Sequence, residues 1–128
     1  MMKKMMKKLL VIDDEPIVLK ALSSQFDAKE IEVLLAKDGA EGLKLAKKEK
    51  PDLILLDLVM PKMDGLEMLA KLRKDKWGKK AEVVILSNLS DSAKVAQAVA
   101  LGTFEYLVKV DWNVADVATK VKKKLGLK

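Results

Sequence analysis

Short apolar runs alternate with amphipathic stretches along the whole chain. Most of the runs are continuously apolar, which is typical of parallel strands covered on both faces. We expect strands at residues 9–12, 33–35, 53–56, 83–86 and 106–108. Apolar residues recur at helical spacing between them, and five strand–helix units of this kind predict an α/β sandwich with right-handed crossovers.

Three of the amphipathic stretches carry a clear apolar stripe. The residues of each stripe fall on one face of a helix: Val18, Ala21, Leu22 and Phe26; Val95, Ala98 and Val99; and Val114, Val117, Ala118, Val121 and Leu125. The lysines of the last stretch lie mostly off its stripe and suit a helix C-terminus. We expect Asp111 to cap this last helix.

Length and composition exclude several classes of protein. The chain has 128 residues, of which 50% are hydrophobic, and this indicates one domain over residues 1–128, with 1–6 as a basic, frayed segment. It contains no cysteine and no histidine, which removes disulfides, a thiolate nucleophile and the usual general base. The run 9–12 is too short to be a signal peptide or a membrane span. We therefore expect a cytoplasmic protein with no membrane partner.

The charge balance is basic, with a formal net charge of +6 from 24 lysines and one arginine set against 19 acidic residues. A positive balance raises the question of nucleic acid. However, the lysines are spread along the chain, with short clusters only at residues 3–8 and 122–124. Solvated helix faces explain this pattern better, so we expect no direct contact with nucleic acid.

Polar residues follow four of the expected strands. They are Asp13 and Asp14, Asp57, Ser87, and Lys109, after the first, third, fourth and fifth strand. Ligands of such sheets bind beyond the carboxyl ends of the strands, so these side chains should share one crevice. Three aspartates without histidine or cysteine form a hard-oxygen site, which suits Mg²⁺.

The same crevice should accept a phosphoryl group, because Mg²⁺ keeps several waters and favours a phosphate partner. Asp57 is the best candidate nucleophile, since a carboxylate is ionised near pH 7 and needs no base. Lys109 and the Ser87 hydroxyl could hold the phosphoryl oxygens. Each residue alone has an ordinary structural interpretation, such as a helix cap for Asp13 or Asp14. Their joint placement favours function.

At these positions the chain resembles the receiver domains of two-component response regulators, of the stand-alone chemotaxis type. The matching marks are the acidic pair in VIDDE, Asp57 followed by MPKMDG, Ser87 after VVIL and Lys109 in EYLVK. The resemblance implies a flavodoxin-like, doubly wound five-stranded parallel sheet of order 2-1-3-4-5 with five helices. It also implies a switch that catalyses its own aspartyl phosphorylation and dephosphorylation, rather than a conventional turnover enzyme.

The resemblance also implies a role for each site residue. Asp57 would take a phosphoryl group from a histidine kinase, a phosphotransfer protein or a small phosphodonor. Asp14 and Asp57 would bind Mg²⁺ directly, Asp13 would act mainly through water, and the main-chain carbonyl of Val59 would complete the set.

The switch that the resemblance implies involves Ser87, Lys109 and Tyr106. The first two would move toward the phosphate, and the aromatic ring would rotate with them. The surface of the fourth helix, fifth strand and fifth helix would then present the change to a downstream protein. Two departures from the family pattern leave a phosphorylation-independent, receiver-like docking module open, namely a pseudo-receiver or an engineered scaffold: Val110 stands where a cis proline is usual, and Asn88 where a small residue is usual.

A hydrolytic phosphatase with an aspartyl-phosphate intermediate is a third class of function. Such an enzyme would typically carry a second aspartate two residues after the nucleophile, where this chain has Val59. No glycine-rich loop of the G-x-x-x-x-G-K type is present, which argues against an NTPase.

Overall fold

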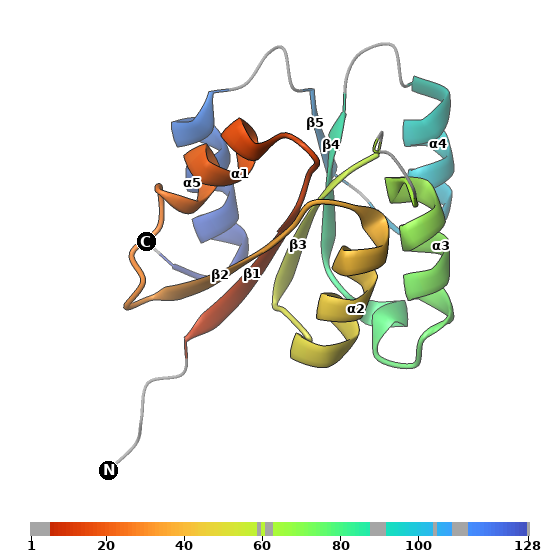
Figure 1. The fold of residues 1–128 in the computed structure, drawn as a ribbon, viewed down its shortest axis with the longest axis horizontal. Helices are drawn as coiled ribbons and strands as arrows, with labels where there is room; N and C mark the ends of the chain where they lie inside the picture. Colours follow the sequence, from red (N-terminus) through yellow and green to blue (C-terminus); the bar gives the residue numbers. More distant parts are fainter. Residues whose placement is uncertain are drawn as a thin grey trace.

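A computed structural model describes residues 6–58, 60, 63–87, 92–103, 105–108 and 113–127, and for residues 87 and 105–108 it describes the main chain only. The described ranges form a parallel sheet with helices on both faces (Figure 1). The elements are β1 (Lys7–Ile12), α1 (Pro16–Ser23), β2 (Ile31–Ala36), α2 (Gly39–Glu49), β3 (Leu53–Asp57), α3 (Gly65–Lys74), the 3-10 helix η1 (Gly78–Lys80), β4 (Val83–Ser87), α4 (Ser92–Ala100), β5 (Glu105–Val108) and α5 (Val114–Lys124).

The sheet has five strands in the order β2-β1-β3-β4-β5, which confirms the doubly wound, flavodoxin-like fold. Each expected strand is present. β1 begins at Lys7 rather than at Leu9, because main-chain pairing with β2 starts at Lys7 opposite Ile31, before the apolar run begins.

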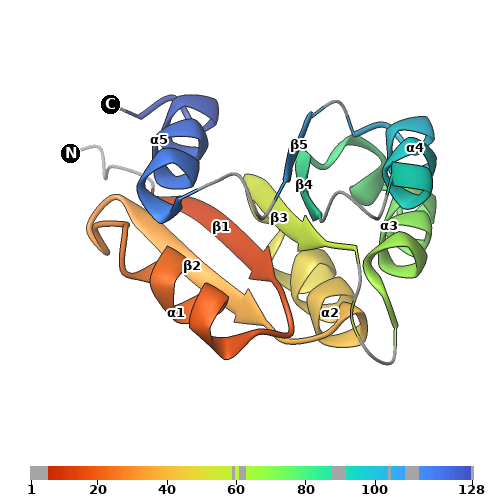
Figure 2. The ribbon, with the colours of Figure 1, turned by 90° about the horizontal axis from the view of Figure 1, so that it is seen from above.

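The strands contribute alternate side chains to two separate cores, as the pleat of a sheet requires. One core lies under α2, α3 and α4, and the other lies under α1 and α5 (Figure 2). Leu10 and Ile12 belong to the first core, and Leu9 and Val11 belong to the second. All four are 0% exposed, which confirms that this strand is covered on both faces.

The expected helical stripes face the two cores, with two corrections. Phe26 was expected in the stripe of the first helix, but α1 ends at Ser23, so Phe26 lies in the turn after the helix, where it still packs against the second core. Val95 and Ala98 of α4 are buried, whereas Val99, which was expected beside them, is 45% exposed. Packing of α4 against α3 and β4 therefore needs only a narrow strip of the helix.

The start of α5 also differs from the expectation. Asn113 is the N-cap, and its side chain accepts a hydrogen bond from the main-chain N–H of Asp116 at 2.9 Å. The prediction that Asp111 caps this helix was wrong, because the first helical turn begins at Val114 and only the residue directly before it can cap. Asp111 itself lies outside the described ranges.

Arg73, the one arginine, ties α3 to two neighbouring segments. Its Nε donates to the carbonyl oxygen of Leu101 at 2.7 Å, and its Nη1 donates to those of Gly78 and Ala81 at 2.7 and 2.8 Å. Burial lowers the pKa of the guanidinium, and the nearby Glu82 carboxylate opposes this effect. The side chain thus acts as a cross-link between the end of α3, the entry to β4 and the end of α4.

No helix in the described part of the chain is long and apolar enough to cross a membrane. Of the N-terminal segment 1–6, only Met6 falls within the described ranges.

Candidate functional site

Asp13 and Asp57 lie at the carboxyl ends of two neighbouring central strands. β1 and β3 pair with Ile12 opposite Leu56, so the residues that follow, Asp13 and Asp57, are side by side. Both are buried, with exposed fractions of 0% and 4%. Asp14, the next residue along the chain, is exposed, so the site has a buried base and an open side.

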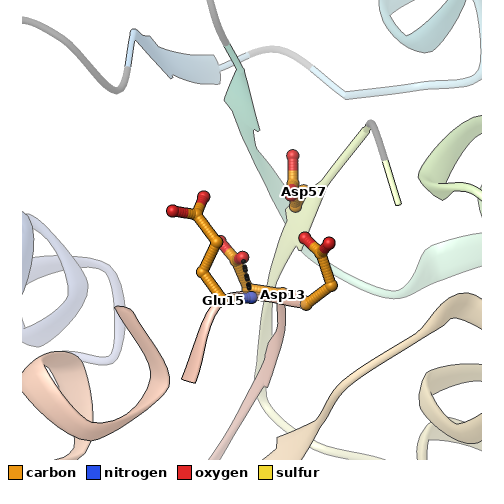
Figure 3. Close-up of side chains that lie close together, drawn as sticks. Asp13, Glu15 and Asp57 are labelled. Atoms are coloured by element: carbon orange, nitrogen blue, oxygen red, sulfur yellow. Dashed lines mark hydrogen bonds between the residues drawn. The ribbon is translucent and has the colours of Figure 1, made fainter. Parts of the chain in front are cut away.

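Four carboxylates meet at this edge of the sheet. One oxygen from each of Asp13, Asp14, Glu15 and Asp57 lies within 4.8 Å of the others. Figure 3 shows three of these side chains close together, at the end of β1, the start of α1 and the end of β3. Negative charges this close repel one another, and an all-oxygen donor set is the one that Mg²⁺ prefers. The residues therefore fit the divalent ion that the sequence predicts.

Glu15 belongs to the cluster although the sequence-based site did not include it. It is the N-cap of α1, but its side chain makes no capping hydrogen bond. Its main-chain N–H donates to Oδ1 of Asp13 at 2.9 Å, which fixes the turn between the strand and the helix. Because Glu15 occupies the cap position, neither Asp13 nor Asp14 is the helix cap. The sequence signal that could have identified Glu15 as part of the cluster was its position directly after the two aspartates in VIDDE.

The chain after Asp57 packs closely against its own strand. The N–H of Gly65 donates to the carbonyl oxygen of Leu58 at 3.0 Å. A Cβ atom at Gly65 would overlap the carbonyl oxygen of Asp57, so only glycine fits there. In addition, the N–H of Gly39, at the start of α2, donates to the carbonyl oxygen of Met63 at 3.0 Å. The main chain around Asp57 is therefore supported by two neighbouring segments.

Ser87 lies at the same edge as the acidic cluster, as judged from its main chain. It ends β4 and pairs with Val108 of β5, while the preceding residue Leu86 pairs with Asp57. The main chain of Tyr106 lies in β5 opposite Ile85. The remaining predictions concern parts of the chain outside the described residues: the side chains of Ser87 and Tyr106, and the whole of Val59, Asn88, Lys109 and Val110.

Residues 9–122 match the family model for the response regulator receiver domain. Among curated proteins, the chain is 35% identical over 118 residues to the alkaline phosphatase synthesis transcriptional regulatory protein PhoP of Bacillus subtilis, covering 92% of this chain and 48% of that protein. It is 38% identical over 104 residues to the transcriptional regulatory protein KdpE of Mycobacterium tuberculosis, covering 81% and 45%. The chain thus spans about half the length of these relatives.

Solved structures of similar length have the same fold. The REC domain of AraT, a response regulator from Geobacillus stearothermophilus, superposes with a TM-score of 0.78 at 30% identity, covering 95% of this chain and 97% of that one. The chemotaxis response regulator CheY4 of Vibrio cholerae superposes with a TM-score of 0.82 at 28% identity, covering 94% and 99%. The likeness therefore extends over almost the whole of each chain.

Proposed function

Because the chain belongs to the family of response regulator receiver domains, we propose that it accepts a phosphoryl group on Asp57 from a histidine kinase or a phosphotransfer protein. The observation that carries this proposal is the position of Asp57. The residue is 4% exposed at the end of a central strand, and one of its carboxylate oxygens lies within 4.8 Å of an oxygen of each of three other carboxylates. The expected cytoplasmic location is part of the same proposal.

Asp57 acts as the nucleophile in this proposal. A carboxylate oxygen attacks the phosphorus of a phosphohistidine, the P–N bond breaks, and its electron pair stays on the departing imidazole nitrogen. The contact of Gly65 with the Asp57 carbonyl holds the nucleophile in one position, which favours in-line attack. Burial of the aspartate also shelters the acyl phosphate from water.

Asp14 and Asp57 would bind Mg²⁺ directly, with Asp13 acting through water and the Val59 carbonyl completing the protein's share. When bound, the ion supplies positive charge that offsets both the carboxylates and the phosphoryl oxygens. The carboxylate of Glu15 lies close enough to add to the negative charge that surrounds the ion.

The phosphodonor protein would dock on α1, beside the acidic cluster. Ile17, in the first turn of this helix, is 82% exposed, although isoleucine is among the residues most often buried. An exposed apolar side chain two residues after Glu15 of the acidic cluster is a suitable contact for the partner that delivers the phosphate.

The switch would follow phosphorylation. Ser87 and Lys109 would hold the phosphoryl oxygens, Tyr106 would rotate, and the surface of α4, β5 and α5 would change its fit to a downstream protein. The main chain of Ser87, next to the strand of Asp57, is the described feature that supports this arrangement.

Incubation with acetyl phosphate and Mg²⁺ tests the proposal. The intact mass of the wild-type protein should increase by one phosphoryl group, and Asp57→Asn should abolish the increase. Asp52→Asn is the matched control, because Asp52 is an exposed aspartate at the opposite edge of the sheet, and this variant should be phosphorylated normally. A wild-type protein that gains no mass while Mg²⁺ is present would favour the phosphorylation-independent docking module instead.

A further inference from the structure

Exposed lysines gather at the edge of the sheet opposite the acidic cluster, and we call this group the lysine rim. They lie in the last turns of α2 and α3, in the turns that follow, and in η1. The rim consists of Lys47, Lys48, Lys50, Lys74, Lys76, Lys79 and Lys80, all of which are exposed.

The segments that carry the rim are neighbours in space. β3 and β4 pair directly, and the N–H of Ile54 donates to the carbonyl oxygen of Glu82 at 2.9 Å. The two connections that enter these strands therefore lie side by side. α2 packs against α3, and α3 packs against η1, at the lower edge of Figure 1. Lysines that are far apart in sequence thus form one surface.

The rim carries a surplus of positive charge. None of its lysines has a carboxylate oxygen within 4.0 Å among the residues that the structure describes. Four carboxylates belong to the same edge, which is fewer than the seven lysines of the rim. Glu82 is exposed, and the other three are bound elsewhere. Glu49 pairs with Lys8 Nζ at 3.0 Å, Asp52 accepts from the main-chain N–H of Lys8 at 2.8 Å, and Asp75 accepts from that of Gly78 at 2.9 Å.

Favourable interaction with helix dipoles explains only part of the rim. Lysines in the last turn of a helix offset the negative end of its dipole, and this accounts for Lys47, Lys48 and Lys74. It also suits Lys50, the C-cap of α2. It does not account for Lys76, which lies in the turn after α3, or for Lys79 and Lys80, which lie in a 3-10 helix of three residues.

The lysine rim has no exposed large apolar side chain among the described residues, and this limits the classes of molecule that it can bind. The exposed large apolar side chains of the described residues are Met6, Ile17, Leu35 and Val99, and none lies in the rim. A membrane surface or a stable protein interface normally needs such side chains. A second copy of the chain is also disfavoured, because each copy carries a net charge of +6.

A nucleic acid satisfies the remaining conditions, since duplex DNA presents one phosphate charge per about 1.7 Å of its axis. Arg73, the only arginine, donates to carbonyl oxygens inside the fold, so the rim offers lysine point charges without a planar group to pair with base edges. We propose that the lysine rim binds nucleic acid through its phosphates, independently of base sequence. The sequence-based expectation of no such contact rested on the spread of the lysines along the chain, and the fold brings them together.

Fluorescence anisotropy with a short labelled DNA duplex of mixed sequence tests the proposal. If five lysines contact phosphates, the affinity should fall roughly 500-fold between about 50 and 200 mM salt, and a second duplex sequence should bind equally well. Two variants lose the same charge, one from the rim and one from exposed lysines elsewhere: Lys48→Gln, Lys79→Gln, Lys80→Gln; and Lys20→Gln, Lys29→Gln, Lys37→Gln.

The rim variant should bind the duplex at least about tenfold more weakly, and the log–log slope against salt should become shallower by about 2.7. The control variant should bind within about twofold of the wild type. Asp57→Asn should leave duplex binding unchanged, which separates this proposal from the phosphorylation chemistry. Equal losses in the two triple variants, binding to phosphatidylserine vesicles but not to DNA, or no duplex binding at about 50 mM salt would each overturn it.

Discussion

Gly65 lies directly against the main-chain carbonyl of Asp57, and a side-chain carbon at position 65 would overlap that oxygen. The oxygen belongs to the main chain at the end of β3, and Gly65 is the first residue of α3. Neither segment can move easily to make room for the added carbon. We expect Gly65→Ala to lower the free energy of unfolding by about 3 kcal/mol and to reduce phosphorylation by acetyl phosphate. Thermal denaturation and intact mass measure the two effects.

Gly126→Ala is the control for this prediction. Gly126 has φ 76° and nothing within 4 Å of an added Cβ, so alanine should lower stability there by only about 1 kcal/mol, through backbone strain alone. Similar losses in the two variants would contradict the proposed contact.

Asp14 should affect stability in opposite directions with and without Mg²⁺. Without the ion, Asp14→Asn relieves repulsion in the acidic cluster and should raise the melting temperature, by an amount corresponding to about 0.5–1 kcal/mol. With Mg²⁺ at about ten times its dissociation constant, the wild type should gain about 1.4 kcal/mol, and the variant should gain much less. Differential scanning fluorimetry over a Mg²⁺ series checks both signs. A variant that is stabilised by Mg²⁺ as strongly as the wild type would argue against Asp14 as a ligand.

Arg73 should contribute to stability through its geometry more than through its charge. Arg73→Lys keeps the charge but cannot reach the carbonyl oxygens of Leu101, Gly78 and Ala81 together. We expect a loss of about 2–3 kcal/mol in urea denaturation. Lys74→Ala, on the exposed side of the same turn, should stay within about 0.5 kcal/mol of the wild type.

The ion pair of Lys8 and Glu49 should make stability depend on pH at both extremes. A hydrogen bond from Lys8 lowers the pKa of Glu49 below its ordinary value of 4.5, and the same bond raises the pKa of Lys8 above 10.5. The contribution of Glu49 is therefore present above pH 4.5 and is lost as the pH falls through its folded pKa. The contribution of Lys8 is present below pH 10.5 and is lost as the pH rises through its folded pKa.

Melting temperatures of the wild type and Glu49→Gln measured against pH test this linkage. The wild type should melt higher at neutral pH, and the two curves should converge in acid. High salt should shrink the difference, because the pair is at the surface. A difference that stays constant into acid would show that the carboxylate charge plays no part.

Ile17 should matter for transfer from a protein but not from a small molecule. Ile17→Ala removes an exposed apolar contact on α1 without touching the acidic cluster. Phosphorylation by a histidine kinase that acts on this chain should slow by about tenfold, while the rate with acetyl phosphate should be unchanged. Slowing of both reactions would place the effect in the chemistry rather than in docking.

The sequence was most informative where one physical signal dominated. Continuous apolar runs identified the strands, because a parallel strand that is covered on both faces carries apolar side chains at consecutive positions. Asp13, Asp14 and Asp57 could be assigned to one crevice because the carboxyl ends of parallel strands share an edge. Glu15 was missed, since its inclusion depends on the tight turn between Asp13 and α1 rather than on strand ends.

Other features could not be predicted because they depend on contacts distant in sequence. Nothing in the neighbourhood of Arg73 indicates a bond to Leu101, 28 residues away. Asp111 and Asn113 are both good caps, and only the register of the last helix decides between them. Position along the chain also concealed the lysine rim, because its members come together only through the pairing of β3 with β4.

The acidic cluster and the lysine rim occupy opposite ends of the central strands. A strand of five residues, such as β3, separates them by roughly 17 Å. A molecule bound at one end therefore does not obstruct the other. Under the two proposals made above, a domain held on DNA through its lysine rim leaves Asp57, at the far end of β3, accessible to a phosphodonor.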